Sequence, residues 1–140
     1  MHEDEISSQL LSIAASNQFE QSSENLVQTW TSEGVGVESF RPVLRFMEDH
    51  PAIDFGSPGP LVHFIEKVAS AGKEEDARYA RELSESIQRK PVPHTAWLLH
   101  RLINVVEGLE KEMYTSMLRN ASRNPKSDPQ TIQAIDELLE

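Results

Sequence analysis

Residues 57–72 read Ser-Pro-Gly-Pro-Leu-Val-His-Phe-Ile-Glu-Lys-Val-Ala-Ser-Ala-Gly, and this stretch decides the fold class. Its large apolar side chains recur at the spacing of one face of an α-helix: Leu61, Phe64, Ile65 and Val68. Proline is accepted in the first turn of a helix, and glycine is common just after the last turn. The pair Pro58 and Pro60 therefore opens a predicted helix, and Gly72 closes it.

The same helical spacing continues along the chain in both directions. Apolar stripes of this kind include Ile6, Leu10 and Ile13; Phe40, Val43, Leu44 and Met47; Tyr79, Leu83 and Ile87; and Ile132, Ile135 and Leu139. No segment alternates convincingly with the two-residue period of a strand. We therefore predict an all-α fold, a compact bundle of about eight short helices, near residues 5–16, 19–32, 39–49, 58–71, 74–89, 94–107, 109–122 and 129–139.

A weak internal echo at an offset of 33 residues suggests one arrangement of these helices. Pro58-Gly59-Pro60 aligns with Pro91-Val92-Pro93, and Phe64 then aligns with Trp97. Stacked helical hairpins, as in HEAT-like repeats, would produce such an echo. A common way of starting a helix would produce it equally well, so the sequence leaves both explanations open.

One predicted helix, at residues 94–107, has apolar side chains around most of its circumference. Such a helix is usually central in a domain, so we expect it to be buried together with its aromatic residue, Trp97. A chain of 140 residues is long enough to bury roughly two thirds of the surface that its unfolded form exposes. No long linker interrupts the pattern, and we predict a single helical domain over residues 1–140.

The composition indicates the cellular compartment. The chain contains no cysteine, which excludes disulfides, thiolate catalysis and cysteine-based metal sites. Its first residues, Met1-His2-Glu3-Asp4-Glu5, are acidic where a secretory signal is basic. No run approaches the roughly 20 apolar residues that span a bilayer. These observations predict a cytoplasmic protein.

The formal net charge is -10, and it is unevenly placed along the chain. Residues 1–60 hold 10 acidic and 2 basic residues, residues 61–126 hold 9 and 11, and residues 127–140 hold 4 and none. Proteins that bind nucleic acids or anionic membranes need clustered Lys and Arg, so we predict neither kind of partner. A basic protein partner fits this charge, because complementary fields accelerate encounter. Solubility alone would also explain the charge.

The acidic residues Glu48, Asp49 and Asp54 form the predicted partner-binding site. They fall at the end of a predicted helix and in the turn that follows it. Loops display binding groups on a rigid scaffold, so this is where we first expect the footprint of a basic partner. The alternative is a solvated turn with no role in binding.

No group of residues in the sequence identifies a reaction or a metal site. His63 and Glu66 are neighbours on one helix face, but they supply two ligands where a typical metal site has three or four. His94 and His100 are six residues apart, which points them to different sides of one helix. The serines and threonines lack the signatures of nucleophilic catalysis. We predict no catalytic residue, no metal and no cofactor.

Two proline-opened segments, residues 54–66 and 89–104, resemble the small all-helical immunity proteins of bacteria. Such proteins are encoded beside toxins in contact-dependent inhibition and other interbacterial competition systems. The matching residues are Pro58, Gly59, Pro60, His63, Phe64, His94, Thr95 and Trp97. The resemblance implies a cytoplasmic protein that binds a cognate toxin domain and blocks it, with the matching residues serving chiefly as scaffold.

These observations together favour a protein that is not an enzyme. The leading hypothesis is an immunity protein that neutralises a cognate, basic toxin domain by binding it. The alternative is a general helical adaptor or a subunit of a cytosolic assembly, which the echo at 33 residues supports. An enzyme that acts at His63 and Glu66 ranks third. The sequence leaves the oligomeric state and the activity of the toxin open.

Overall fold

The structure, a computed structural model, describes residues 1–140 and contains no strand. Its elements are α1 (Glu3–Ile13), α2 (Phe19–Ser32), the 3-10 helix η1 (Val37–Ser39), α3 (Phe40–Asp49), α4 (Gly59–Ala69), α5 (Lys73–Arg89), α6 (Pro93–Ile103), α7 (Gly108–Ala121) and α8 (Pro129–Leu138). The prediction of an all-α fold with about eight helices is confirmed. None of these helices combines the length and the apolar character needed to cross a membrane.

The predicted helix ends agree with the structure to within a few residues, and the largest difference is at α6. This helix ends at Ile103, four residues before the predicted end. Asn104 forms its C-cap, and Val105 beyond it is 77% exposed. Val105 and Val106 are β-branched, which lowers their preference for helix, so the apolar run continues past the point where the helix stops.

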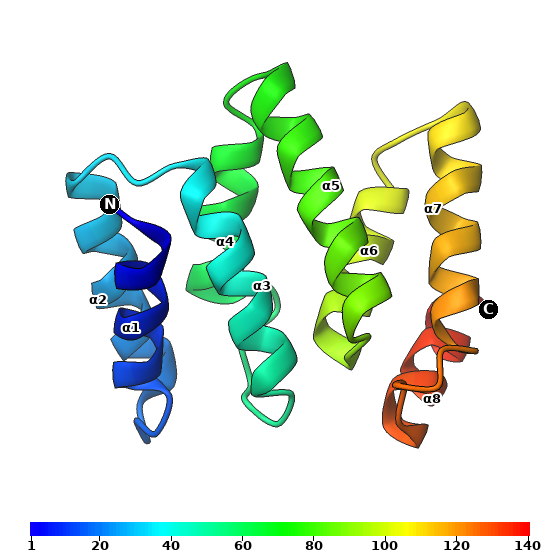
Figure 1. Cartoon of the computed structure of the whole chain (residues 1–140), viewed down its shortest axis with the longest axis horizontal. Coiled ribbons are helices and arrows are strands. Elements are labelled where there is room, and N and C mark those ends of the chain that lie inside the picture. Colours follow the sequence, from blue (N-terminus) through cyan, green and yellow to red (C-terminus); the bar gives the residue numbers. More distant parts are fainter. The chain divides into compact units, whose positions relative to one another are not determined.

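The contacts along the chain divide it into two compact units, and the boundary falls within α5 (Figure 1). Unit 1 covers Met1–Tyr79, and unit 2 covers Ala80–Glu140. Unit 1 therefore contains α1 to α4 and the first turns of α5, whereas unit 2 contains the rest of α5 and α6 to α8. The single domain expected from the sequence stays a prediction.

In unit 1, a helix packs against the next helix in the chain or against the helix after that one. Helix α1 packs against α2 and α3, and α2 packs against α4 (Figure 1). Packing between helices two places apart is the arrangement of stacked hairpins. The fully buried side chains at the centre of this unit include Ile6, Leu10, Trp30, Phe40, Leu44, Met47, Leu61 and Ile65.

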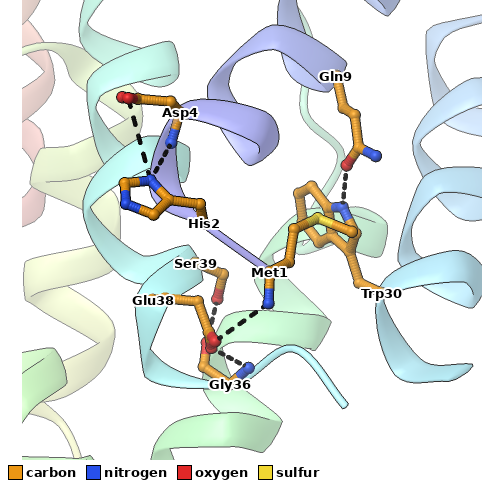
Figure 2. A network of polar contacts seen from close by, with 8 residues as sticks. All are labelled: Met1, His2, Asp4, Gln9, Trp30, Gly36, Glu38 and Ser39. Carbon is orange, nitrogen blue, oxygen red and sulfur yellow. Dashed lines mark hydrogen bonds and ion pairs between the residues drawn. The ribbon is translucent and has the colours of Figure 1, made fainter. Parts of the chain in front are cut away.

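Polar contacts hold the buried Trp30 and the loop after α2 in unit 1 (Figure 2). Trp30 donates a hydrogen bond from Nε1 to Gln9 Oε1 at 2.7 Å, which joins α2 to α1. In the loop after α2, the Gly36 N–H donates to the Glu38 carboxylate, and Ser39 Oγ donates to the Gly36 carbonyl at 2.7 Å. These bonds satisfy buried polar groups and lead the chain from α2 through η1 into α3.

Unit 2 is built around α6, which packs against both α7 and α8. The central position predicted for this helix is confirmed for its buried face, but Trp97 is only half-buried. Trp97 lies on the side of the helix opposite the centre of that face, where Leu99 and Leu102 are buried. Its ring contacts His94 at 5.3 Å and the Arg101 guanidinium at 5.0 Å.

Candidate functional site

The three acidic residues predicted to bind a partner differ in their exposure to solvent. Glu48 is buried on α3, with 3% of its surface exposed, and takes part in an interaction within the chain. Asp49 and Asp54 are exposed. Only Asp49 and Asp54 can therefore offer a carboxylate to a partner, and their role in binding stays a prediction.

Asp54 also shapes the turn between α3 and α4. Its Oδ1 accepts a hydrogen bond from the Gly56 N–H at 2.9 Å, as in an Asx-turn. The intervening residue, Phe55, is buried, and its ring packs edge-on against Phe19 at 5.7 Å and Phe46 at 6.0 Å. This aromatic cluster anchors the turn on α2 and α3, and so sets where α4 begins.

The anchored turn forms part of one wall of a groove between α2 and α4, and this groove is the candidate functional site. Its hollow has a volume of about 500 Å³, within the range of ligand pockets. A second hollow, at the start of α2, shares Glu20, Glu24 and Pro60 with the first, so the two adjoin. The groove is lined by Gln18, Glu20, Gln21, Glu24, Val27 and Thr31 of α2, by the turn residues 56–58, and by Gly59, Pro60, His63, Phe64 and Lys67 of α4.

Two glycines are needed for the shape of the turn at this groove. Gly56 has a φ of 94°, and Gly59 has a φ of 82°, both in the region that L side chains rarely adopt. A Cβ atom on Gly56 would lie 2.5 Å from the Gly59 Cα, closer than real Cβ contacts allow. The Gly-Ser-Pro-Gly-Pro run therefore does more than start a helix, because it folds back on itself to form a wall of the groove.

The groove combines an acidic wall with an apolar floor. Glu20 and Glu24 are exposed one turn apart on α2, and no hydrogen bond or ion pair within the chain engages their carboxylates. Phe64 is nearly buried at the floor, and His63 and Lys67 are exposed on the α4 side. An apolar floor below free carboxylates suits a long cationic side chain, whose stem is apolar and whose head is charged.

Sequence reasoning identified one wall of this groove and missed the other. The resemblance to immunity proteins draws attention to the motif at residues 58–64, as scaffold. Glu20 and Glu24 contribute to the acidic charge of residues 1–60, which does not single them out. Their spacing of four residues places them on one helix face, and this is the signal that could have singled them out.

The histidines considered for chemistry lie on two helices, α4 and α6. His63 is exposed in the groove, whereas Glu66 is half-buried and engaged within the chain. His94 and His100 are half-buried on α6. No three His, Asp or Glu side chains come together in a group that could hold a metal ion. Comparison of the chain with protein-family models, with curated proteins and with solved structures finds no match.

Proposed function

We propose that this chain is an immunity protein that neutralises a toxin by holding a basic segment of the toxin domain in the α2–α4 groove. The observation that carries the proposal is the pair of exposed, unengaged carboxylates of Glu20 and Glu24 beside the floor at Phe64. A lysine or arginine of the toxin can lay its stem on that floor while its head meets the carboxylates. The bound chain then neutralises the toxin by covering part of its surface, without a catalytic step.

The distribution of charge between the two units supports a basic partner for this groove. Unit 1 holds 14 acidic and 5 basic residues, whereas unit 2 holds 9 acidic and 8 basic residues. Nearly all of the net negative charge therefore belongs to the unit that contains the groove. A field of one sign accelerates encounter with a partner of the opposite sign and discriminates against others.

The resemblance to immunity proteins supports the same location. Its first segment, residues 54–66, supplies the turn and the α4 wall of the groove. Its second segment, residues 89–104, covers the whole of α6 in unit 2. There Thr95 Oγ1 donates to the Val92 carbonyl at 3.3 Å and helps to begin the helix, which agrees with a scaffold role.

The toxin must also contact surface outside the groove. A specific interface buries about 800 Å² on each partner, and a few central residues supply most of its binding energy. The groove provides such a centre. Asp49 and Asp54 are exposed on the same unit and are candidates for the surrounding rim, where charge changes the association rate more than the affinity.

The first test is affinity capture with the tagged chain from a lysate of the source cells, with the captured proteins identified by mass spectrometry. We expect a toxin domain in equal stoichiometry with the chain. Production of the chain should then protect cells that are exposed to that toxin. Capture of a housekeeping complex, without protection from any toxin, would contradict the proposal and favour the general adaptor.

The groove itself is tested by the double variant Glu20→Lys with Glu24→Lys. It reverses the acidic wall without changing a buried residue, so toxin binding should weaken by roughly tenfold or more. The control is Asp136→Lys with Glu140→Lys, which makes the same change in net charge at exposed positions in unit 2. An equal loss of binding in both variants would show that net charge matters and the groove does not.

A further inference from the structure

One face of α7 carries apolar side chains that the fold leaves uncovered. Leu109 is 84% exposed and Met113 is 51% exposed, and the half-buried Met117 continues their row. Residues four positions apart lie on one helix face, and these three span about 12 Å along the axis. We call Leu109, Met113 and Met117 the α7 stripe.

The α7 stripe borders a groove within unit 2, between α7 and the end of α5. The groove has a volume of about 380 Å³. Gln88 lines the α5 side, and Met113, Met117 and Asn120 line the α7 side. Asn124 closes one end, where its Nδ2 donates a hydrogen bond to the Gln88 carbonyl at 3.2 Å. The groove thus combines the apolar side chains of Ile87, Met113, Met117 and Ala121 with the polar side chains of Gln88, Ser116, Asn120 and Asn124.

The two ends of α7 differ in charge. Glu110 and Glu112 lie near its start, whereas residues 113–127 contain no acidic residue. Asp128, the next acid along the chain, is exposed; its carboxylate accepts a hydrogen bond from the Thr131 N–H and interacts with the charge of Lys90. Exposed basic residues next to Gln88 and Asn124 along the chain are Lys90, Arg123 and Lys126. A chain with a net charge of -10 therefore places a local excess of positive charge beside a groove that Met113 and Met117 line.

The backbone of the occupant limits what can lie in this groove. Helices satisfy their own backbone groups, so α5 and α7 offer a partner no free ladder of N–H and C=O groups. An extended segment would leave its backbone groups poorly paired there, whereas an amphipathic helix pairs its own. Helices that lie in such grooves use anchors at positions i, i+3 or i+4 and i+7, and methionine surfaces adapt readily to them.

We propose that the α7 stripe and its groove bind an amphipathic helix of a protein partner, and that this helix carries a cluster of acidic residues at one end. The apolar face of the helix packs on Met113 and Met117. Its carboxylates meet Arg123 and Lys126 at the closed end of the groove, where opposite charge fixes the direction of the helix. The chain then recognises two partner segments of opposite charge, one in each unit.

The test uses the full chain and three fluorescent helical peptides. The first has leucine at the anchor positions and a run of glutamates at one end. The second has the same anchors with lysines in place of the glutamates, and the third has the glutamates with serine at the anchors. Fluorescence anisotropy should show the first peptide binding roughly tenfold or more tightly than the others. Equal binding of the acidic and basic peptides would overturn the proposal.

Two variants with matched controls locate the site. Met113→Glu puts a charge on the α7 stripe, whereas Leu11→Glu does the same on α1 in unit 1, at a residue that is 62% exposed. Arg123→Glu reverses a charge at the closed end, whereas Arg45→Glu reverses an exposed charge on α3. We expect Met113→Glu and Arg123→Glu each to weaken the acidic peptide by roughly tenfold, with both controls unchanged. Thermal melts check that every variant is folded.

A second copy of the chain is the rival occupant, and sedimentation velocity distinguishes it from a partner helix. A dimer that Met113→Glu dissociates would overturn the proposal, as would variants that all bind the acidic peptide like the parent chain. The proposal is supported if the chain is a monomer that binds the acidic peptide and if Met113→Glu weakens this binding as expected. The variant Glu20→Lys with Glu24→Lys should bind the peptide like the parent chain, so this result stands apart from the outcome of the toxin test.

Discussion

Trp30 and Trp97 lie in different environments. Trp30 is fully buried, is hydrogen-bonded to Gln9, and packs edge-on against Phe64 at 5.4 Å, whereas Trp97 is half-buried against Arg101. Trp30→Ala should lower the free energy of unfolding by about 3–5 kcal/mol through the cavity that it leaves. Trp97→Ala should cost well under about 3 kcal/mol, because less surface is buried and the cation–π contact is weak. Urea denaturation measures both, and equal losses would contradict this assignment.

Asp128 caps the start of α8, and its contribution to stability should depend on pH. Its Oδ1 accepts a hydrogen bond from the Thr131 N–H at 2.8 Å, and this bond lowers the pKa of the carboxyl below its ordinary value of 3.8. Because the pKa is lower in the folded state, the stabilisation is complete above pH 3.8 and is lost as the pH falls through the folded pKa. Asp128→Ala should therefore cost about 0.5–2 kcal/mol at neutral pH, and less in acid.

Denaturation across a pH series measures this loss. Asp128→Asn is the control, because asparagine caps a helix about as well as aspartate but does not titrate. It should keep most of the stability at neutral pH and lose the dependence on acid. A cost for Asp128→Ala that is the same at every pH would show that the charge of the carboxylate contributes nothing.

Glu48 shows why the exposure of a single acidic residue was not predictable from the sequence. On α3, only Arg41, Arg45 and Asp49 are exposed, and they form one row spaced by four residues. Asp49 belongs to this row, and Glu48 lies off it. The sequence displays the apolar face of α3, but how much of the remaining surface is covered depends on contacts with α1 and η1. Those contacts follow from packing, not from local pattern.

At the scale of the element, the turn before α4 allows a direct test through its glycines. Gly56 and Gly34 both have positive φ, at 94° and 71°. A Cβ atom on Gly56 would clash with Gly59, whereas one on Gly34 would meet nothing within 4 Å. We expect Gly34→Ala to cost about 1 kcal/mol from backbone strain alone, and Gly56→Ala to cost more. Thermal melts measure both costs.

The same pair of variants connects the turn to the proposed function. Because the turn forms a wall of the α2–α4 groove, Gly56→Ala should also weaken toxin binding at a temperature where the protein remains folded. Gly34→Ala lies outside the groove and should bind the toxin as the parent chain does. If both variants bind equally well, the shape of the turn does not matter for the toxin.

The helices were predictable from the sequence because the signals that begin and end them are local. Helix α2 covers Phe19–Ser32, as predicted, and Pro129 opens α8 at the predicted position. The groove was not predictable, because it requires α2 to pack against α4 across the chain that connects them. Glu20 and the turn at residues 56–60 were each visible in the sequence, but nothing local placed them on opposite sides of one hollow.

At the scale of the whole molecule, the net charge of -10 is divided unequally between the two units. Unit 1 carries almost all of it, whereas unit 2 is nearly balanced and gathers its basic residues near the ends of α5 and α7. Charge that serves only solubility has no reason to concentrate beside grooves. The two proposed partners are therefore opposite in charge. The effect of salt on association can be measured for each of them without a structure of either complex.

Salt should slow the association of the basic toxin and leave its dissociation nearly unchanged. The screening length falls from about 30 Å at 0.01 M salt to about 8 Å at 0.15 M, so steering by the charge of unit 1 is lost over this range. Stopped-flow fluorescence measures the rates. Glu20→Lys with Glu24→Lys should reduce the salt slope for the toxin, and Arg123→Glu should reduce it only for the acidic helix. An association rate that ignores salt would mean that apolar contacts select the partner and that the charge keeps the protein soluble.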